Sequence, residues 1–254
     1  MYEREIETAI RAVKGAAERA LRIQSEGLKP EYKADESPVT AADKASEAFI
    51  AATLEEAFPM DGLLGEEGSN RPARSGRRWI VDPIDGTRDF IRGNQLWAIL
   101  LGLEEQDRVV AGAVYLPVLD RLFWAARGEG AYEGDRRLHV SSISTVAESV
   151  ICFNNLVGAA KEEYAERVVP WIGNFWSSRA LGGALDAMML AAGQVEVWVE
   201  PKVAPWDLAG PSIILEEAGA CFFDLKGRNS IYGGSAAACV PALEGEVKRF
   251  LQLA

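Results

Sequence analysis

Acidic side chains recur at positions where an apolar run ends or where a helix is predicted to begin. Carboxylates and backbone carbonyls are the ligands that hard divalent cations such as Mg²⁺ prefer. In layered α/β folds, ligands collect at the carboxyl ends of strands and the amino ends of helices, so these side chains could converge on one metal site. The candidates are Asp43, Glu66, Glu67, Asp82, Asp85 and Asp207.

Two of these carboxylates stand three residues apart in the segment DPIDGT, residues 82–87, directly after an apolar run. Pro83 fixes one backbone dihedral angle and stiffens the segment, so Asp82 and Asp85 can present their side chains to one cavity. The Ile84 carbonyl then stays available as a further oxygen ligand. This spacing predicts a rigid pair of carboxylates suited to a metal ion.

The same segment could also receive a phosphate group. Gly86 and Thr87 are predicted to open a short helix or turn, whose free N–H groups suit a phosphate oxygen. The net charge of -11, from 38 acidic and 27 basic residues, disfavours an anionic ligand unless a metal ion reverses the local charge. It also argues against a nucleic-acid partner, since no basic cluster larger than RSGRR is present.

Each acidic position also has a purely structural interpretation. Residues 82–86 fit a type I turn, and Asp43 fits a capping box with Thr40 at the start of a helix. Asp207 fits a helix N-cap, and the acidic segment 65–68 fits a solvated loop. Taken singly, the turn and the capping box are the better interpretations; joint occurrence at strand and helix ends favours a shared site.

Histidine and cysteine are too sparse to support other common chemistries. The single histidine, His139, excludes a multi-histidine zinc site, and we expect it to be a half-exposed strand residue. The N-terminus is charged, with no signal or transit peptide, and no apolar run is long enough for a membrane helix. The cysteines lack CxxC spacing and indicate reduced core residues of a cytoplasmic protein: Cys152, Cys221 and Cys239.

Hydrophobic periodicity predicts the elements that must position the acidic side chains. A helix is expected over residues 3–26, a second from about Thr40, and a short buried strand that breaks at Gly65. Residues 96–126 indicate three antiparallel strands with turns at 104–108 and 117–120.

After residue 140 strands and helices alternate, so we expect two closely packed halves, residues 1–145 and 146–254. The predicted fold class is therefore α+β, with an antiparallel sheet and helices in the first half and a mixed α/β second half. The predicted strands of the second half are 149–154, 175–180, 195–200, 220–224 and 236–240, and its predicted helices are 161–172, 182–193, 206–219 and 241–251.

Three motifs, in this order and spacing, resemble the inositol monophosphatase family: GEE at 65–67, WIVDPIDGT at 79–87 and PWDLAG at 205–210. The likeness covers nearly the whole chain, including SPVTAADKASE at 37–47. It implies a layered αβαβα sandwich, the sugar-phosphatase fold. It further implies Mg²⁺-dependent hydrolysis of a small phosphate monoester by a lithium-sensitive homodimer.

The resemblance also implies metal ligands, residue by residue. Glu66, Asp82 and the Ile84 carbonyl would hold a first Mg²⁺, and Asp82, Asp85 and Asp207 a second. A third, weaker Mg²⁺ would lie near Glu66. Two ions about 3.5–4 Å apart can activate water and stabilise the leaving alkoxide without a histidine, which fits this chain.

The family pattern assigns catalytic roles to Asp43 and Thr87, which would orient the attacking water, and to Glu66. The amides of Gly86 and Thr87 would cradle phosphate, and Glu200 would contact a substrate hydroxyl. The complete set implied to bind substrate is Asp85, Gly86, Thr87, Gly183, Glu200 and Asp207.

The sequence indicates the substrate less clearly than it indicates the family. Leu181 stands where the family commonly has a glycine, and DFIRGNQLW at 89–97 resembles the histidinol-phosphatase branch. We expect inositol-1-phosphate or a similar polyol phosphate first, and the amino-alcohol ester histidinol phosphate second. Fructose-1,6-bisphosphatase or phosphoadenosine-phosphate phosphatase activity, or a non-catalytic metal-binding role, ranks lower.

Overall fold

The computed structural model describes residues 1–28, 31–32 and 38–253. Ser37, the first residue of the family-like segment 37–47, therefore lies outside the described residues. The described α-helices are α1 (Glu3–Glu26), α2 (Ala41–Ala57), α3 (Thr87–Ile91), α4 (Leu156–Ala159), α5 (Ala165–Ile172), α6 (Gly183–Ala191), α7 (Pro205–Glu217) and α8 (Glu244–Phe250), with 3₁₀ turns at Val146–Glu148 and Pro241–Leu243.

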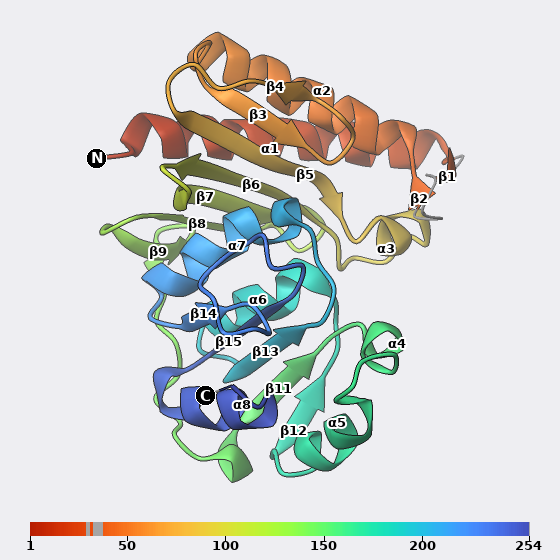
Figure 1. Ribbon diagram of the computed structural model, residues 1–254. Helices are drawn as coiled ribbons and strands as arrows, with labels where there is room; N and C mark the ends of the chain where they lie inside the picture. Colours follow the sequence, from red (N-terminus) through yellow and green to blue (C-terminus); the bar gives the residue numbers. More distant parts are fainter. Residues whose placement is uncertain (29–30, 33–37, 254) are drawn as a thin grey trace.

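Helices and sheets alternate in five layers (Figure 1). Helices α1 and α2 cover the outer face of a first sheet, α6 and α7 lie between the two sheets, and α5 and α8 cover the far side of the second sheet (Figure 1). The predicted αβαβα sandwich is confirmed. Residues of the hydrophobic core lie on both sides of each layer boundary, which is what a stack of amphipathic elements requires.

The first sheet has eight strands in the described residues, in the order β10-β9-β8-β7-β6-β5-β3-β4. The three strands predicted over 96–126 are confirmed as the antiparallel neighbours β6, β7 and β8. The first-half sheet is antiparallel as predicted, except that β3 runs parallel to β5. Its strands are β3 (Gly62–Gly65), β4 (Asn70–Arg71), β5 (Arg77–Asp85), β6 (Ala98–Glu105), β7 (Arg108–Leu116), β8 (Arg121–Ala126), β9 (Gly130–Glu133) and β10 (Arg136–Arg137).

The second sheet is mixed, with five described strands in the order β12-β11-β13-β15-β14. Strand β11 runs parallel to both β12 and β13, whereas β15 is antiparallel to β13 and β14. A separate two-stranded ladder joins β1 (Glu31–Tyr32) to β2 (Pro38–Val39). The strands of the second sheet are β11 (Val150–Phe153), β12 (Ser177–Arg179), β13 (Val197–Glu200), β14 (Cys221–Phe223) and β15 (Ala236–Cys239).

Several predicted elements differ from the structure in detail. The helix expected from residue 161 begins only at Ala165, and the strand expected over 175–180 is limited to Ser177–Arg179. His139 is exposed and follows β10, so its predicted place in a strand is wrong. The short helix α4 has no periodic pattern long enough to predict it.

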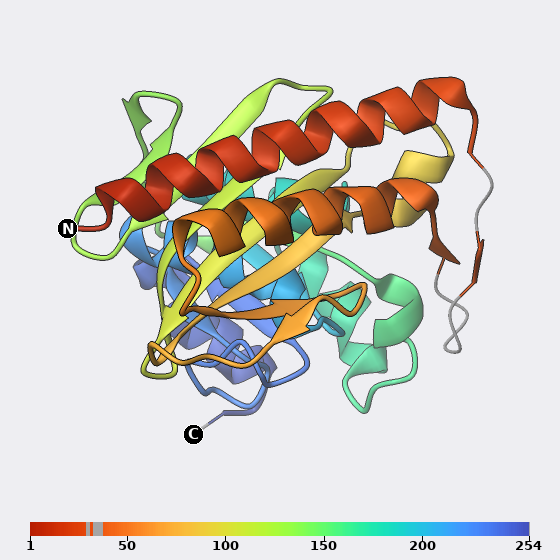
Figure 2. The ribbon, with the colours of Figure 1, turned by 90° about the horizontal axis from the view of Figure 1, so that it is seen from above.

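The outer helices α1 and α2 run side by side across the first sheet (Figure 2). Small side chains let them approach closely: a Cβ atom on Gly15 of α1 would lie 2.3 Å from the Phe49 ring of α2. The buried face of α1 repeats at helical spacing, from Ile6 through Ala9 and Val13 to Ala16. No described helix combines the length and the hydrophobicity needed to cross a bilayer.

Helix α7, from the second half of the chain, packs against the first sheet. Gly102 of β6 has no side chain, and a Cβ atom there would lie 2.6 Å from the Cβ atom of Ala209. Gly210 of α7 faces the same sheet, where a Cβ atom would lie 3.0 Å from the Leu101 carbonyl oxygen. These glycines let the first turn of α7 approach the end of β5. The division at residue 145 stays a prediction, since α7 belongs to the C-terminal half.

Candidate metal centre and substrate cavity

Three carboxylates predicted to bind metal converge in the structure. Asp82 and Asp85 lie near the carboxyl end of β5, and Asp207 lies in the first turn of α7. Each offers one ligand oxygen, and these oxygens all lie within 4.8 Å of one another.

An irregularity in β5 brings the two aspartates of that strand together. Residues three apart in a regular strand point to opposite faces. In β5 the pairing with β6 shifts between Asp82, opposite Leu100, and Asp85, opposite Ala98. One extra residue is therefore accommodated between Asp82 and Asp85, and both carboxylates line the same cavity. The segment therefore forms a β-bulge within β5 and not the type I turn that its sequence also allowed.

Backbone hydrogen bonds hold the carboxylates in place. The Ile84 N–H donates to Asp82 Oδ1 at 3.0 Å, and the Ala204 N–H donates to Asp207 Oδ2 at 2.7 Å. Asp207 is thus not the N-cap of α7; Pro205 occupies the first helical position and Ala204 is the N-cap. From the third helical position, the Asp207 carboxylate accepts a hydrogen bond from the backbone of the N-cap residue Ala204.

Asp43 combines a structural role with a place at the site. Its Oδ2 atom accepts hydrogen bonds from the Thr40 N–H at 2.8 Å and from Thr40 Oγ1 at 2.6 Å, so the predicted capping box is present. Its Oδ1 atom lies 3.3 Å from Thr87 Oγ1, which is also 3.1 Å from the Ile84 carbonyl oxygen. Capping α2 and contacting Thr87 are compatible because each uses a different oxygen.

Glu66 lies in the loop after β3 and lines the same cavity as Asp82 and Thr87. The buried Glu47 side chain fixes this loop: Oε2 accepts from the Glu67 N–H and Oε1 from the Ser69 N–H, both at 2.7 Å. Glu67 is not among the residues that line the cavity, and its backbone N–H is one of the two groups that Glu47 holds.

The sequence analysis did not identify Glu47. A signal was present, because Glu47 stands four residues after Asp43 and therefore on the same face of α2. Both side chains are buried, at 1% exposure each, which is unusual for acidic residues without a functional or structural partner.

Burial and mutual repulsion raise the pKa values of Asp82 and Asp85. Burial, followed by the nearby Asp207 carboxylate, raises the pKa of Asp85 to about 7. Burial and the Glu66, Asp207 and Asp85 carboxylates raise the pKa of Asp82 well above its ordinary value. Like charges this close favour either protonation or a bound cation, and an all-oxygen donor set fits a hard divalent ion.

A second cavity of about 400 Å³ adjoins the carboxylates and shares Asp85, Gly86, Arg88 and Asp207 with the first. The start of α6 forms one wall. The Ala184 N–H donates to Asp85 Oδ2 at 2.9 Å, and a Cβ atom on Gly183 would lie 2.4 Å from that same oxygen. Glycine is therefore required where α6 approaches the acidic cluster.

Glu200 lies at the far wall of this second cavity, at the end of β13. It is 7% exposed, and burial together with the Asp85 and Asp207 charges raises its pKa to about 8, against the opposing effect of a hydrogen bond from Asn154. The structure thus brings together every residue predicted for the site apart from Glu67. It adds Asn154 and Trp198, which the sequence analysis did not identify, to the lining of the second cavity.

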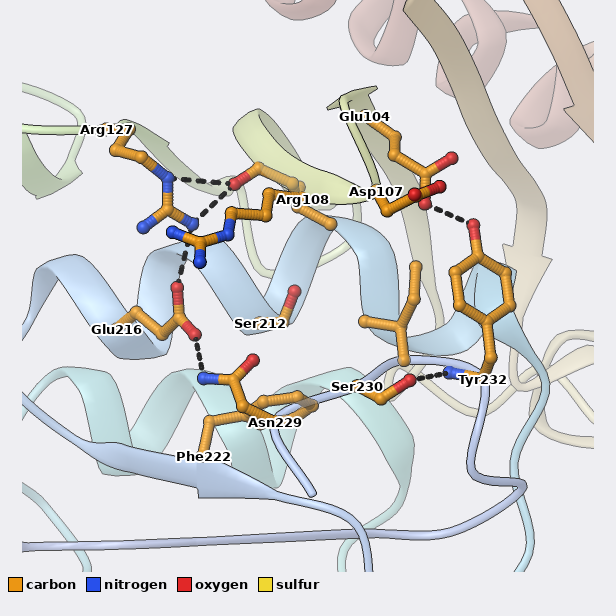
Figure 3. Close-up of a pocket in the computed structure, with 12 residues that line it drawn as sticks. Glu104, Asp107, Arg108, Arg127, Ser212, Glu216, Phe222, Asn229, Ser230 and Tyr232 are labelled. Atoms are coloured by element: carbon orange, nitrogen blue, oxygen red, sulfur yellow. Dashed lines mark hydrogen bonds and ion pairs between the residues drawn. The ribbon is translucent and has the colours of Figure 1, made fainter.

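A third cavity, of about 310 Å³, lies away from these residues (Figure 3). Its polar groups pair with one another: Tyr232 donates to Glu104, and Arg127 contacts Glu216, which also accepts from Asn229 (Figure 3). Among the described residues that line it, none has a buried side-chain atom without a partner. Nothing in this cavity calls for a ligand.

Comparison with known proteins agrees with the geometry. A sequence model of the inositol monophosphatase family matches residues 1–251. The histidinol-phosphatase of Mycobacterium tuberculosis is 40% identical over 232 residues, which cover 89% of each chain. The inositol-1-monophosphatase of Rhizobium meliloti is 34% identical over 206 residues, covering 80% of this chain and 77% of the relative. The crystal structure of extragenic suppressor protein suhB from Bartonella henselae, 29% identical, superposes with a TM-score of 0.88 over 97% of both chains.

Proposed function

This chain belongs to the inositol monophosphatase family and is a phosphoric monoester hydrolase, and from this premise we propose that its substrate is histidinol phosphate. The product alcohol would be the amino alcohol histidinol. The order of the two leading substrates is thereby the reverse of the one expected from the sequence, which placed inositol-1-phosphate first.

The buried Glu200 carboxylate carries this choice. It lies in the cavity beside the acidic cluster, where the alcohol of a bound phosphate ester would extend. A carboxylate that is 7% exposed and close to two further acids is costly to ionise without a cationic partner. The ammonium group of an amino alcohol supplies such a partner, whereas a neutral polyol supplies only hydrogen bonds. The relative named histidinol-phosphatase, at 40% identity, supports the same substrate.

Inositol-1-phosphate is the second candidate. A carboxylate also accepts hydrogen bonds from sugar hydroxyls, and a relative named inositol-1-monophosphatase is 34% identical to this chain. The two candidates differ in charge, so one carboxylate can distinguish them.

We propose Mg²⁺ as the cofactor, with two ions and a weaker third. Glu66, Asp82 and the Ile84 carbonyl would hold the first ion, and Asp82, Asp85 and Asp207 the second, with the third near Glu66. When bound, Mg²⁺ supplies Lewis-acid chemistry: it lowers the pKa of water and offsets negative charge on the phosphoryl and leaving oxygens.

The chain itself would position the water and the phosphate. Thr87 Oγ1 has one proton and lies within hydrogen-bonding distance of Asp43 Oδ1 and the Ile84 carbonyl oxygen, so its lone pairs can accept a hydrogen bond from water. Asp43 fixes the direction of that hydroxyl. The Gly86 and Thr87 amides at the start of α3 would bind a phosphoryl oxygen, and Gly183 would border the alcohol.

A phosphate-release assay with Mg²⁺ tests the proposal. The substrates are histidinol phosphate, inositol-1-phosphate, fructose-1,6-bisphosphate and phosphoadenosine phosphate, each with and without chelator. We expect kcat/KM for histidinol phosphate to exceed the others at least tenfold. A preference for inositol-1-phosphate would establish the second candidate, and activity that survives excess chelator would refute the metal-dependent mechanism.

A further inference from the structure

The side chain of Asn154 is buried and incompletely hydrogen-bonded. It is 4% exposed; its amide group hydrogen-bonds the Glu200 carboxylate and so opposes the rise in the pKa of Glu200, whereas its Oδ1 atom has no partner within the described residues. Buried side-chain amides are nearly always hydrogen-bonded, because leaving donors and acceptors unpaired destabilises the fold. A buried amide that lines a cavity and keeps an unpaired oxygen indicates a group that a ligand completes.

The pairing of β11 with β13 places Asn154 beside Glu200. In this parallel pair Phe153 lies opposite Val199, so the next residues along the two strands are also neighbours. The Asn154 N–H extends the ladder by donating to the Val199 carbonyl at 3.0 Å. Side chains of neighbouring residues point to the same face of a sheet, and both of these line the 400 Å³ cavity.

Trp198 adds an unpaired donor to the same wall. It stands two residues before Glu200 on β13, hence on the same face, and it also lines the cavity. Its side chain is 2% exposed, and its Nε1 atom is buried without a partner in the described part of the chain. The wall therefore presents a carboxylate, an amide and an indole N–H together.

We propose that Asn154 is a specificity-determining residue whose side-chain amide hydrogen-bonds the imidazole ring of histidinol phosphate, while Glu200 pairs with the ammonium group. This inference rests on the proposed function. A neutral imidazole has one N–H donor, and the unpaired Oδ1 atom of Asn154 can accept its hydrogen bond. Trp198 supplies an aromatic surface and an N–H donor beside the ring.

A purely structural role for Asn154 makes a different prediction. Replacing Asn154 with the similarly sized Leu removes an unpaired buried oxygen together with the hydrogen bond to Glu200. The two effects on stability oppose each other, so Asn154→Leu should change the melting temperature little. A residue retained for folding would lower it.

Three substrates distinguish the contribution of the imidazole ring from that of the ammonium group and the phosphate ester. Histidinol phosphate carries an ammonium group and an imidazole, O-phosphoethanolamine carries the ammonium alone, and inositol-1-phosphate carries neither. Asn154→Leu should lower kcat/KM for histidinol phosphate about 10- to 100-fold and change that for inositol-1-phosphate less than about threefold. The loss on O-phosphoethanolamine should be clearly smaller than that on histidinol phosphate, since it reflects only the hydrogen bond from Asn154 to Glu200. The matched control is Asn174→Leu, whose exposed amide donates to carbonyls at the end of the preceding helix α5. Asn154→Ser, smaller and polar, provides a second variant should the Leu side chain fail to fit.

The outcomes separate the inference from the function on which it rests. Full activity of both Asn154 variants on histidinol phosphate, or an equal loss on all three substrates, overturns the inference alone. A parent enzyme that hydrolyses inositol-1-phosphate and not histidinol phosphate overturns the proposed function and the inference together. A lowered melting temperature with unchanged selectivity returns Asn154 to a structural role.

Discussion

Asp43 and Thr87 lie 44 residues apart in the sequence, yet the Thr87 hydroxyl is 3.3 Å from Asp43 Oδ1. The other oxygen of Asp43 caps helix α2 through Thr40. One buried carboxylate thus fixes both the start of a helix and the direction of a hydroxyl at the acidic cluster. Any disturbance of that helix start is expected to reach the site.

Thr87 should affect turnover more than substrate binding. Thr87→Ala removes the hydroxyl that would orient water but keeps the backbone amide that would contact phosphate. We expect kcat to fall about 10²- to 10⁴-fold, with KM changed less than about threefold. Thr87→Ser keeps a hydroxyl and is the control. Steady-state kinetics of both variants give the answer, and a rise in KM alone would assign Thr87 to binding.

Asp82 should be essential for metal-dependent activity without being needed for folding. Asp82→Asn removes one charge from a cluster whose ligand oxygens lie within 4.8 Å of one another. We expect turnover to fall at least ~100-fold and Mg²⁺ affinity to weaken, because the proposal places this carboxylate between two ions. Without metal, the melting temperature should stay the same or rise, since repulsion is relieved. Asp135→Asn, in the exposed turn between β9 and β10, is the control; near-normal turnover of Asp82→Asn would refute the two-metal proposal.

The raised carboxyl pKa values predict how stability depends on pH. In the folded, metal-free protein the pKa of Asp85 is about 7, against 3.8 for an ordinary aspartate. Between these two values the folded state binds more protons than the unfolded chain, so stability should fall as the pH rises through that window. Bound Mg²⁺ requires the charged carboxylates and should reverse the trend.

Thermal unfolding in chelator and in excess Mg²⁺ tests this prediction. In chelator we expect the melting temperature to decrease from about pH 5 to about pH 8. The increase caused by Mg²⁺ should be larger at the higher pH. An increase that shrinks with rising pH would show that these acids do not bind the ion as carboxylates.

Glu47 should govern Mg²⁺ dependence from outside the cluster. Its two oxygens accept the Glu67 and Ser69 N–H groups, each at 2.7 Å, and so hold the loop that carries Glu66. Glu47→Ala leaves both donors unpaired, which should cost about 1–3 kcal/mol of unfolding free energy and raise the Mg²⁺ concentration needed for half-maximal activity. Urea unfolding and Mg²⁺ titration measure these effects, with Glu56→Ala on the exposed face of α2 as control. If only stability falls, Glu47 does not position Glu66.

The local sequence was sufficient to predict the part of the site whose ligands and backbone geometry lie in one short segment. Residues 82–87 contain two carboxylates, a proline and a helix start, so their joint function was predictable. The way in which the two carboxylates converge was not predictable from the sequence. The bulge depends on the pairing of β5 with β6, and a type I turn fitted the local sequence equally well. Asp207 was predicted at a helix start, but its approach to β5 depends on glycines in other elements, such as Gly102.

Asn154 and Trp198 show why part of the site could not be predicted. Neither belongs to a motif, and both fall inside predicted strands, where a polar or aromatic residue is ordinary. Their place beside Glu200 follows from the register of β11 and β13, and the unpaired Asn154 Oδ1 and Trp198 Nε1 atoms are visible only once the surrounding side chains are in position. Such information is held in tertiary packing and not in local periodicity.

Glu200 should decide between the two candidate substrates. Glu200→Gln keeps the shape and hydrogen-bonding capacity of the side chain but removes its charge. If Glu200 pairs with the ammonium of histidinol phosphate, kcat/KM for that substrate should fall about 100-fold, because a desolvated charge pair is lost. The loss on inositol-1-phosphate should stay below about tenfold, since a carboxamide still accepts a hydroxyl hydrogen bond. The measurement is kcat/KM of parent and variant on both esters, with Asp135→Asn as the charge-neutralising control. A loss confined to inositol-1-phosphate would favour a polyol substrate, and no change on either ester would remove Glu200 from the site.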